Sequence, residues 1–196
     1  MNSIRKYIYL RLKDLISKAG IRLIEITFKD KEGIDLFSVR LGEVELYYNP
    51  EKYDKKAIAL LFSEIGFALL IDPDDVIMEK IRIAAIELIH YANNANSLIR
   101  NSDYISEKLG IPYEKLSRLF SKKTGKTLEN FILRLKIEKV KHLIYSQDYT
   151  LSEIAYMLDY SSVQYLSNQF KKVTGISVSQ YKESGNKDWL PMEEIM

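Results

Sequence analysis

The N-terminal part of the chain alternates between short β-prone stretches and stretches with helical spacing of apolar residues. Tyr7–Leu10 is rich in β-forming residues and predicts a strand. Apolar residues over Leu12–Ala19 recur at helical spacing and predict a helix that Gly20 ends. Leu23–Phe28 then predicts a second strand, which a charged turn follows.

The same alternation continues to residue 72. Phe37–Tyr48 predicts an extended stretch with a bulge or bend at Gly42, and Asn49-Pro50 breaks it. Ala57–Ala68 predicts a second helix, and Leu69–Ile71 a short last strand. The resulting order, βαββαβ, suits an antiparallel sheet with both helices on one face, so we expect a small α+β domain of ferredoxin-like topology.

This order is similar to that of heavy-metal-associated domains, which carry a Cys-x-x-Cys loop after the first strand. That place reads Tyr9-Leu10-Arg11-Leu12 here, and the chain contains no cysteine. Disulfides, thiol catalysis and thiolate metal sites are therefore excluded. The two histidines, His90 and His142, have no partners at ligand spacing, so we expect no metal and no other cofactor. Sensing and dimerisation remain the two roles open to this domain.

One longer helix follows the small domain. Asp72-Pro73-Asp74 combines a cap candidate, a proline for the first turn and acidic residues at the positive end of a helix. Apolar residues at i, i+4, i+7 and i+11 from Ile77 share one face, and the helix is expected to run to about Tyr91. The segment Asn93–Ser97 then marks a joint.

The C-terminal half contains an internal duplication. Leu116–Gly125 realigns without a gap with Leu166–Gly175, at an offset of 50 residues. Leucine, serine, phenylalanine, lysine, threonine and glycine match at equivalent places. A repeat of this kind indicates one supersecondary unit used twice.

A short helix and a tight turn precede each copy, which is the helix-turn-helix pattern. The helices with their turns are Tyr104–Leu109 with Gly110–Pro112, and Leu151–Leu158 with Asp159–Ser161. The cap candidates are Ser102 or Asp103 for the first helix and Thr150 or Ser152 for the second.

The second helix of each pair has two different faces. The apolar faces carry Leu116, Leu119 and Phe120 in the first copy and Leu166, Phe170 and Val173 in the second, and ordinary core packing explains them. The opposite faces carry Glu114, Ser117, Arg118 and Ser121, and Gln164, Ser167, Asn168 and Lys171. Arginine, glutamine and asparagine are the groups that read base edges in a major groove. An ion pair between Arg118 and Glu114, or a solvated Arg118, is the alternative.

A helix is expected between the two units, from a cap at Thr127 to Ser146, which would hold the readers about one duplex turn, roughly 34 Å, apart. Its basic side consists of Arg134, Lys136, Lys139, Lys141 and His142. The formal charge of +2 is unevenly distributed: roughly −1 up to Asn94 and about +6 from Arg100 to Lys182. A basic domain attracts polyanions, although a solvated surface would show the same excess.

The stretch Asp103–Lys182 resembles the DNA-binding domain of the AraC family. The motifs that carry the resemblance are Leu109-Gly110, Leu116–Phe120, Lys136–Lys141, Ile154-Ala155, Tyr165–Ser167, Phe170-Lys171 and Thr174-Gly175. The departures are Ser106 for alanine, Asp159 for glycine, Asn168 for arginine and Val178 for proline. Aspartate tolerates the left-handed backbone that the glycine would adopt, so the turn should survive.

The resemblance implies an all-α double helix-turn-helix domain that binds double-stranded DNA and regulates transcription. The residues expected at DNA are Tyr113, Glu114, Ser117, Arg118, Ser121 and Lys122 in the first unit, and Val163, Gln164, Ser167, Asn168 and Lys171 in the second. RNA polymerase and a second copy of the chain, bound through the N-terminal domain, are the expected protein partners. Alternatively, the N-terminal domain senses a ligand or partner and controls the DNA-binding output.

Enzymatic activity is not expected, because the chain has no phosphate-cradling glycine loop, nucleophile elbow or cluster of metal ligands. It has neither a signal peptide nor an apolar run of roughly 18 residues, which predicts a cytoplasmic protein without membrane contact. The expected domains are 1–72, a connecting helix and joint at 73–99, the DNA-binding domain at 100–183, and a tail at 184–196. The tail should be poorly ordered, although Trp189-Leu190 could dock onto a partner or the body.

Overall fold

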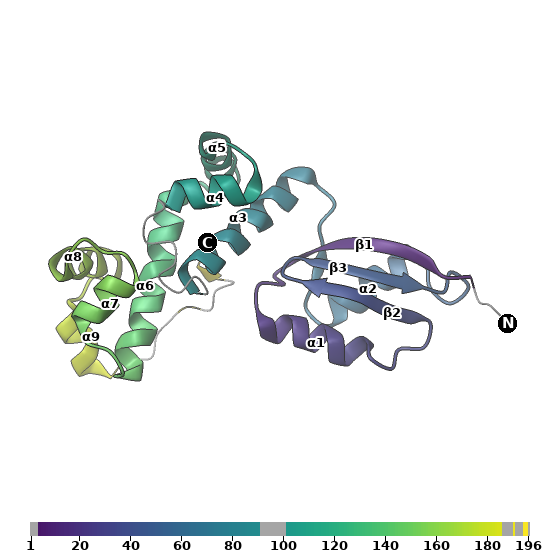
Figure 1. Cartoon of the computed structure of the whole chain (residues 1–196), viewed down its shortest axis with the longest axis horizontal. Helices are drawn as coiled ribbons and strands as arrows, with labels where there is room; N and C mark the ends of the chain where they lie inside the picture. The colour runs from purple at the N-terminus through teal and green to yellow at the C-terminus, as the bar shows by residue number, and fades with distance from the viewer. Residues whose placement is uncertain (1–3, 91–100, 186–189, 191–193, 196) are drawn as a thin grey trace. The chain divides into compact units, whose positions relative to one another are not determined.

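The computed structural model describes residues 4–90, 101–185, 190 and 194–195. The chain divides into two compact units, Met1–Ile83 and Ala84–Met196. Figure 1 shows strands only in the first unit, and the second is helical. Within the described residues, no helix has both the length and the apolar character needed to cross a bilayer.

The first unit is a small antiparallel sheet with two helices, in the βαββαβ order expected from the sequence. Its elements are β1 (Lys6–Lys13), α1 (Lys18–Phe28), β2 (Ile34–Arg40), β3 (Glu43–Tyr48), α2 (Lys55–Glu64) and β4 (Ala68–Leu69). The strands lie in the order β2-β3-β1-β4, and each neighbouring pair is antiparallel.

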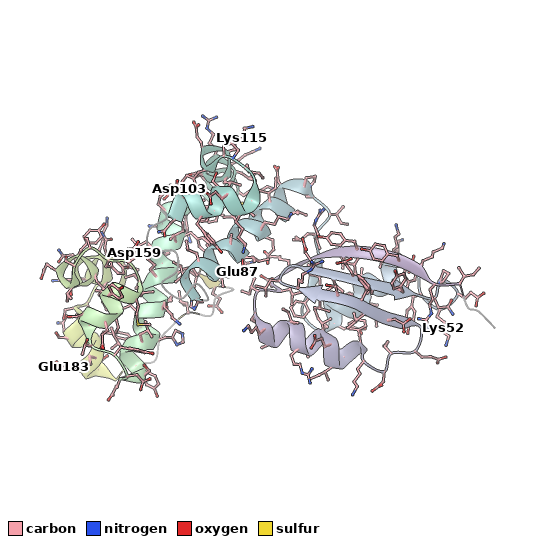
Figure 2. The ribbon with its side chains drawn as sticks, viewed as in Figure 1. Lys52, Glu87, Asp103, Lys115, Asp159 and Glu183 are labelled. Atoms are coloured by element: carbon pink, nitrogen blue, oxygen red, sulfur yellow. The ribbon has the colours of Figure 1, made fainter. Side chains whose placement is uncertain are left out.

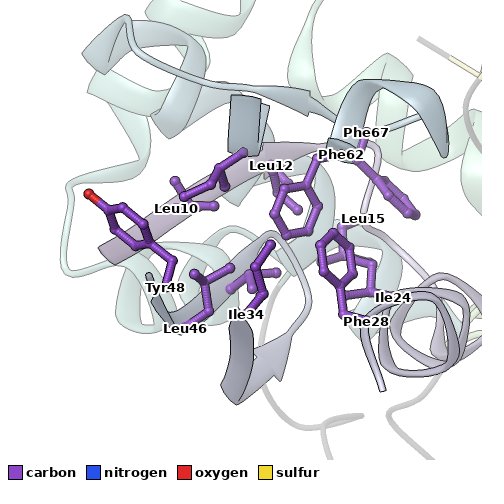
Figure 3. Packing of buried hydrophobic residues seen from close by; sticks show 12 residues of the cluster. Leu10, Leu12, Leu15, Ile24, Phe28, Ile34, Leu46, Tyr48, Phe62 and Phe67 are labelled. Atoms are coloured by element: carbon purple, nitrogen blue, oxygen red, sulfur yellow. The ribbon is translucent and has the colours of Figure 1, made fainter. Parts of the chain in front are cut away.

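The core of this unit lies between the helices and one face of the sheet. Side chains alternate along the strands, so Leu10 and Leu12 of β1 and Leu46 of β3 point to the same buried side. Figure 3 shows these residues packed around Phe28 of α1 and Phe62 of α2. The two phenyl rings stack with centroids 4.8 Å apart. Both helices therefore contribute to the same core, and the other face of the sheet points away from it.

The first helix is displaced from its expected place. Leu12 belongs to strand β1, whereas Leu23–Phe28, expected as a strand, forms the second half of α1. Ser17 caps α1, because its side-chain oxygen accepts a hydrogen bond from the Gly20 amide at 3.1 Å. Gly20 therefore lies in the first turn of the helix and does not end it.

Gly42 does not form a bulge. It lies in the turn between β2 and β3 with a φ of +73°, and an added Cβ would come within 2.6 Å of Ile83. The irregularity of the sheet lies instead in β2, where the register with β3 shifts between Leu36 and Ser38. The expected single stretch Phe37–Tyr48 is thus parts of two strands joined by a tight turn.

Helix α3 runs over Pro73–His90, and the boundary between the two units falls within it. Asp72 accepts hydrogen bonds from the amides of Asp74 and Asp75 at 2.8 and 3.1 Å, as a cap does. Arg82 on this helix is buried, and its guanidinium contacts Asp14 and Glu79, each at 2.8 Å. The expected joint at Asn93–Ser97 lies outside the described residues.

The second unit is all helical, as expected. After the last turns of α3 it contains α4 (Asn101–Leu109), α5 (Tyr113–Thr124), α6 (Leu128–Ser146), α7 (Leu151–Met157), α8 (Val163–Thr174) and α9 (Val178–Ser184). Figure 1 shows α6 between the α4–α5 pair and the α7–α8 pair.

The helix starts in this unit partly follow expectation. Thr150 caps α7 in a reciprocal capping box with Glu153, and Thr127 caps α6. Ser102 and Asp103 are helical residues of α4 (Asn101–Leu109), so neither of them is its cap.

The C-terminal tail is more ordered than expected at the positions that the structure describes. Glu183 and Ser184 belong to α9. The Leu190 amide donates a hydrogen bond to Glu138 of α6 at 2.9 Å, and Ile195 is buried. Trp189 lies outside the described residues.

Candidate nucleic-acid interface

The two repeated helices, α5 and α8, are built on the same core pattern. Leu116 and Phe120 are buried on α5, and Leu166 and Phe170 are buried at the equivalent places on α8. Spacing of i and i+4 puts each pair on one face of its helix. The interpretation of these stripes as ordinary core is confirmed.

The two repeated helices also end in the same way. Thr124 and Thr174 each donate a side-chain hydrogen bond at 2.8 Å to the carbonyl of the phenylalanine four residues earlier. Gly125 and Gly175 then end the helices in the left-handed conformation, with φ of +71° and +83°.

A second helix starts in the same way after each copy. Thr127 caps α6, and Ser177, 50 residues later, caps α9. The rings of Phe131 and Tyr181 pack at 5.2 and 5.4 Å on the phenylalanine of their own copy. Residues 113–131 and 163–181 are therefore structurally equivalent, and α9, which the sequence analysis missed, corresponds to the first turns of α6.

The turns before α5 and α8 both use a left-handed residue. Gly110 has a φ of +63°, and Asp159 has a φ of +56°. The expectation that aspartate keeps this turn intact is thus confirmed. The turns place the first residue of each repeated helix at Tyr113 and Val163.

The outward face of α5 is exposed, as a reading surface requires. Glu114, Arg118 and Lys122 are exposed, while Ser117 and Ser121 on the same face are half-buried. Arg118 Nη2 lies 2.7 Å from Glu114 Oε1, and the two side chains are 78% and 77% exposed. The alternative of an ion pair with Glu114 is therefore realised in this structure. A pair this exposed contributes only about 0.3–0.5 kcal/mol, so it can be exchanged for other contacts.

The outward face of α8 has neutral amides in the same places. Gln164, Asn168 and Lys171 are exposed, and Val163 and Ser167 are half-buried. Gln164 Nε2 donates a hydrogen bond to Asn168 Oδ1 at 3.4 Å. This pair is equivalent to Glu114 and Arg118, so one charged pair and one amide pair occupy matched positions.

The sequence analysis missed several exposed residues on these helices, among them Lys115, Tyr165 and Lys172. Lys115 and Tyr165 are equivalent by the 50-residue offset, and Tyr165 is 49% exposed. Figure 2 shows Lys115 on α5. Lys172 is also exposed and is the true equivalent of Lys122. The offset would have identified Lys172 through the predicted Lys122, whereas Lys115 and Tyr165 pair only with each other.

The expected basic side of α6 is not a continuous exposed surface. Lys141 is buried, and its Nζ contacts Glu138 at 2.9 Å. Lys136 donates from Nζ to the Leu158 carbonyl at 2.9 Å, and burial lowers its pKa. Arg134 and His142 are exposed. The lysines at 136 and 141 therefore hold the unit together and do not face a polyanion.

A groove of about 600 Å³ lies beside α6, between the two helix-turn-helix units. Its lining includes Tyr113, Glu129, Lys136, Tyr160, Tyr165 and Gln169. The Tyr113 hydroxyl donates to Glu129 at 2.8 Å, and both burial and this carboxylate raise the tyrosine pKa. Burial raises the pKa of Tyr160 to about 12. The described residues contain no group of three side chains suited to a metal ion.

Comparison with known proteins identifies this unit. A family model described as a helix-turn-helix domain matches residues 105–184. Residues 105–184 are an AraC-type helix-turn-helix domain. The chain is 29% identical over 100 residues to the xylose operon regulatory protein of Escherichia coli K12. This match covers 51% of this chain and 26% of that protein.

Two further proteins are similar to the AraC-type domain. The transcriptional activator RhaS of Escherichia coli O1:K1 is 25% identical over 83 residues, covering 42% of this chain and 28% of that protein. A crystal structure from Chromobacterium violaceum, titled a transcriptional regulator with an AraC-type DNA-binding domain, is 18% identical. It covers 57% of this chain and 96% of that one, with a TM-score of 0.46. The chain spans only about a quarter of the length of the xylose operon regulatory protein and of RhaS.

Proposed function

We propose that the chain is a transcription regulator that binds double-stranded DNA sequence-specifically through its two helix-turn-helix units. The observation that carries the proposal is the pair of matched helices α5 and α8, which share one core pattern and present different exposed polar faces. A common core with different outward residues suits two readers that recognise different bases.

The proposed contacts differ in kind along each helix. Arg118 reads a guanine edge after leaving Glu114, while Gln164 and Asn168 read adenine edges. Lys122 and Lys171 contact phosphates. The residues proposed to line the remaining contact surface are Tyr113, Glu114, Ser117, Ser121, Val163 and Ser167.

The N-terminal domain is proposed to control the DNA-binding output, by sensing or by association. Its ferredoxin-like assignment is supported by the strand order β2-β3-β1-β4, with β1 and β3 in the centre. The domain bounds proposed are 1–72, 73–99, 100–183 and 184–196. RNA polymerase and a second copy of the chain are the proposed protein partners, and the cytoplasm is the proposed location. No catalytic role is proposed, because the matched relatives are named as regulators.

Selection of bound fragments from random duplex DNA tests the proposal. The full chain should enrich a site with two preferred blocks, their centres about 10 base pairs apart, because the readers enter successive turns of one groove. Double substitution of Arg118 and Asn168 by alanine serves as the control and should abolish the enrichment while leaving weak binding. Absence of enrichment by the wild-type chain would contradict the proposed function.

A further inference from the structure

Four aromatic side chains lie on the sheet face that points away from the helices of the first unit. Tyr7 and Tyr9 alternate with the buried Leu10 and Leu12 of β1, and Tyr47 alternates with the buried Leu46 and Tyr48 of β3. Phe37 joins them from β2. Their exposed fractions run from 37% for Tyr9 to 67% for Phe37. The open face of an antiparallel sheet is ordinarily polar, so this cluster, the aromatic sheet face, calls for an explanation.

The rings of the aromatic sheet face are held in contact with one another. Tyr7 and Tyr47 are directly opposite in register, with ring centroids 5.6 Å apart, and Phe37 meets Tyr47 edge-on at 6.2 Å. The Tyr7 hydroxyl donates to Glu45 at 2.7 Å. Rings that are already ordered lose little entropy when a partner binds, which favours their use as interface anchors.

Charged side chains of both signs surround these rings. Arg11 of β1 and Arg40 of β2 both pair in register with Glu43 of β3. The Arg11 guanidinium also lies 5.3 Å from the centre of the Tyr9 ring. Arg40 contacts Glu45 in an ion pair at the same face. Arg5 and Asp35 form a further ion pair beside Tyr47, so the face carries charges of both signs around its aromatic centre.

We propose that the aromatic sheet face binds the same face of a second copy of this chain. A two-fold interface places one patch against itself, so a patch of a single charge would repel its partner, whereas two arginines and two glutamates can pair across the axis. Tyrosine, phenylalanine and arginine are also the residues enriched at protein interfaces. A single-stranded nucleic acid fits less well, because its phosphates would meet Glu43 and Glu45.

This assignment locates the interface of the homodimer proposed above. It rests on the proposed function only because the homodimer was proposed there. Two copies joined through their N-terminal domains would present four reading helices in one assembly. Linked readers gain affinity from effective concentration without any new contact to DNA.

Sedimentation of the full chain tests the face directly. The wild-type chain should approach twice its mass of 22.9 kDa as concentration rises. Phe37→Ser and Tyr47→Ser should each raise the dissociation constant of the dimer at least about tenfold, the loss expected for a central interface residue. The matched controls are Ile26→Ser on α1 and Leu60→Ser on α2, each removing an apolar side chain that is 60% exposed in the same unit. They should leave the constant unchanged, and circular dichroism would confirm that all four variants fold.

A charge exchange tests the pairing across the axis. Arg11→Glu and Glu43→Arg should each weaken self-association, and an equimolar mixture of the two variants should recover dimers of mixed composition. A chain that stays monomeric at every concentration would overturn the proposal, as would dimers equally sensitive to the helix controls and the face variants. Binding of single-stranded oligonucleotide that Phe37→Ser abolishes would assign the face to nucleic acid instead. Duplex binding by a monomeric Phe37→Ser variant would show that the proposed function stands whichever result is found here.

Discussion

Arg118 and Glu114 form an exposed ion pair on α5, with 2.7 Å between Nη2 and Oε1. The matched positions on α8 hold Asn168 and Gln164, whose amides meet at 3.4 Å. On α5, Arg118 must therefore break an ion pair before it can contact DNA. On α8, Asn168 needs to break only an amide hydrogen bond. This difference sets the expectations for the substitutions that follow.

Replacing Arg118 with alanine should weaken binding to the selected site by about 1–3 kcal/mol and relax preference at one base pair. Asn168→Ala is the matched variant, since it removes the equivalent side chain. It should cost less, and its effect should fall on a base pair about one helical turn away. Titrations with the selected duplex and a scrambled duplex distinguish base reading from a backbone contact. Equal losses on both duplexes for Arg118→Ala would make Arg118 a phosphate contact.

Replacing Glu114 with glutamine should strengthen binding to both the selected and the scrambled duplex. The substitution gives α5 the residue that α8 has, removes a negative charge facing phosphates and frees Arg118 from its partner. The gain should be a few tenths of a kcal/mol up to about 1 kcal/mol, the range of an exposed pair. Glu107→Gln on α4 also removes an exposed carboxylate and is the control for general charge. A loss of affinity on Glu114→Gln would assign Glu114 itself to base contact.

Duplex binding by the full chain should depend steeply on salt. With about 5–8 phosphate contacts, log affinity should fall against log salt with a slope near −0.9 for each contact. Lys122→Ala and Lys171→Ala should each reduce that slope by roughly 1 and weaken all sequences equally. Lys52→Ala, in the first unit, is the control and should change neither quantity. A slope that does not depend on Lys122 or Lys171 would remove them from the interface.

Acid should destabilise the second unit through His90. Burial, then the positive charges of Lys139 and His142, lower the pKa of His90 to about 4. An unfolded chain takes up this proton at about pH 6.5. Between these values the unfolded state binds more protons, so the stabilisation present above pH 6.5 is lost as the pH falls toward 4. The loss should reach about 3 kcal/mol, at about 1.4 kcal/mol for each pKa unit.

Urea unfolding of the full chain at a series of pH values measures this loss. His90→Gln should remove most of the dependence, because a neutral side chain takes its place. His142→Gln replaces an exposed histidine and should remove less. Identical pH profiles for wild type and His90→Gln would show that other groups govern acid stability.

Much of the second unit could be predicted because the same sequence pattern occurs in it twice. Leu116 and Phe120 recur as Leu166 and Phe170, and the turn before each copy carries a residue suited to a positive φ. Helix α9 was missed because Val178 stands where a proline is frequent and the capping box of Ser177 and Gln180 was not recognised.

The first unit shows how local preference can favour the wrong element. Leu23–Phe28 is β-prone by composition, yet it is helical because Ile24 and Phe28, one turn apart, both enter the core. Gly20 suggests a helix end, but the Ser17 cap places it in the first turn. The predicted order βαββαβ is nevertheless correct, because the number and type of the elements were right although their boundaries were not.

The proposed reading surface could be only partly predicted for a different reason. Residues were selected by the chemistry of base contact, which favoured Arg118 and Lys171 and passed over Tyr165 and Lys172. Which side chains are exposed depends on how each helix rotates against its core. That rotation is set by packing against α6 and α9 and cannot be read from residue type.

The equivalence of residues 113–131 and 163–181 has a consequence for how this domain can change. Each copy keeps its buried leucine and phenylalanine, its threonine-glycine ending and its following cap, while its outward positions differ in charge and length. The outward residues of one copy should therefore be transferable onto the other as a set with the fold retained. Exchanging these residues between α5 and α8 should change which DNA sequence each helix prefers.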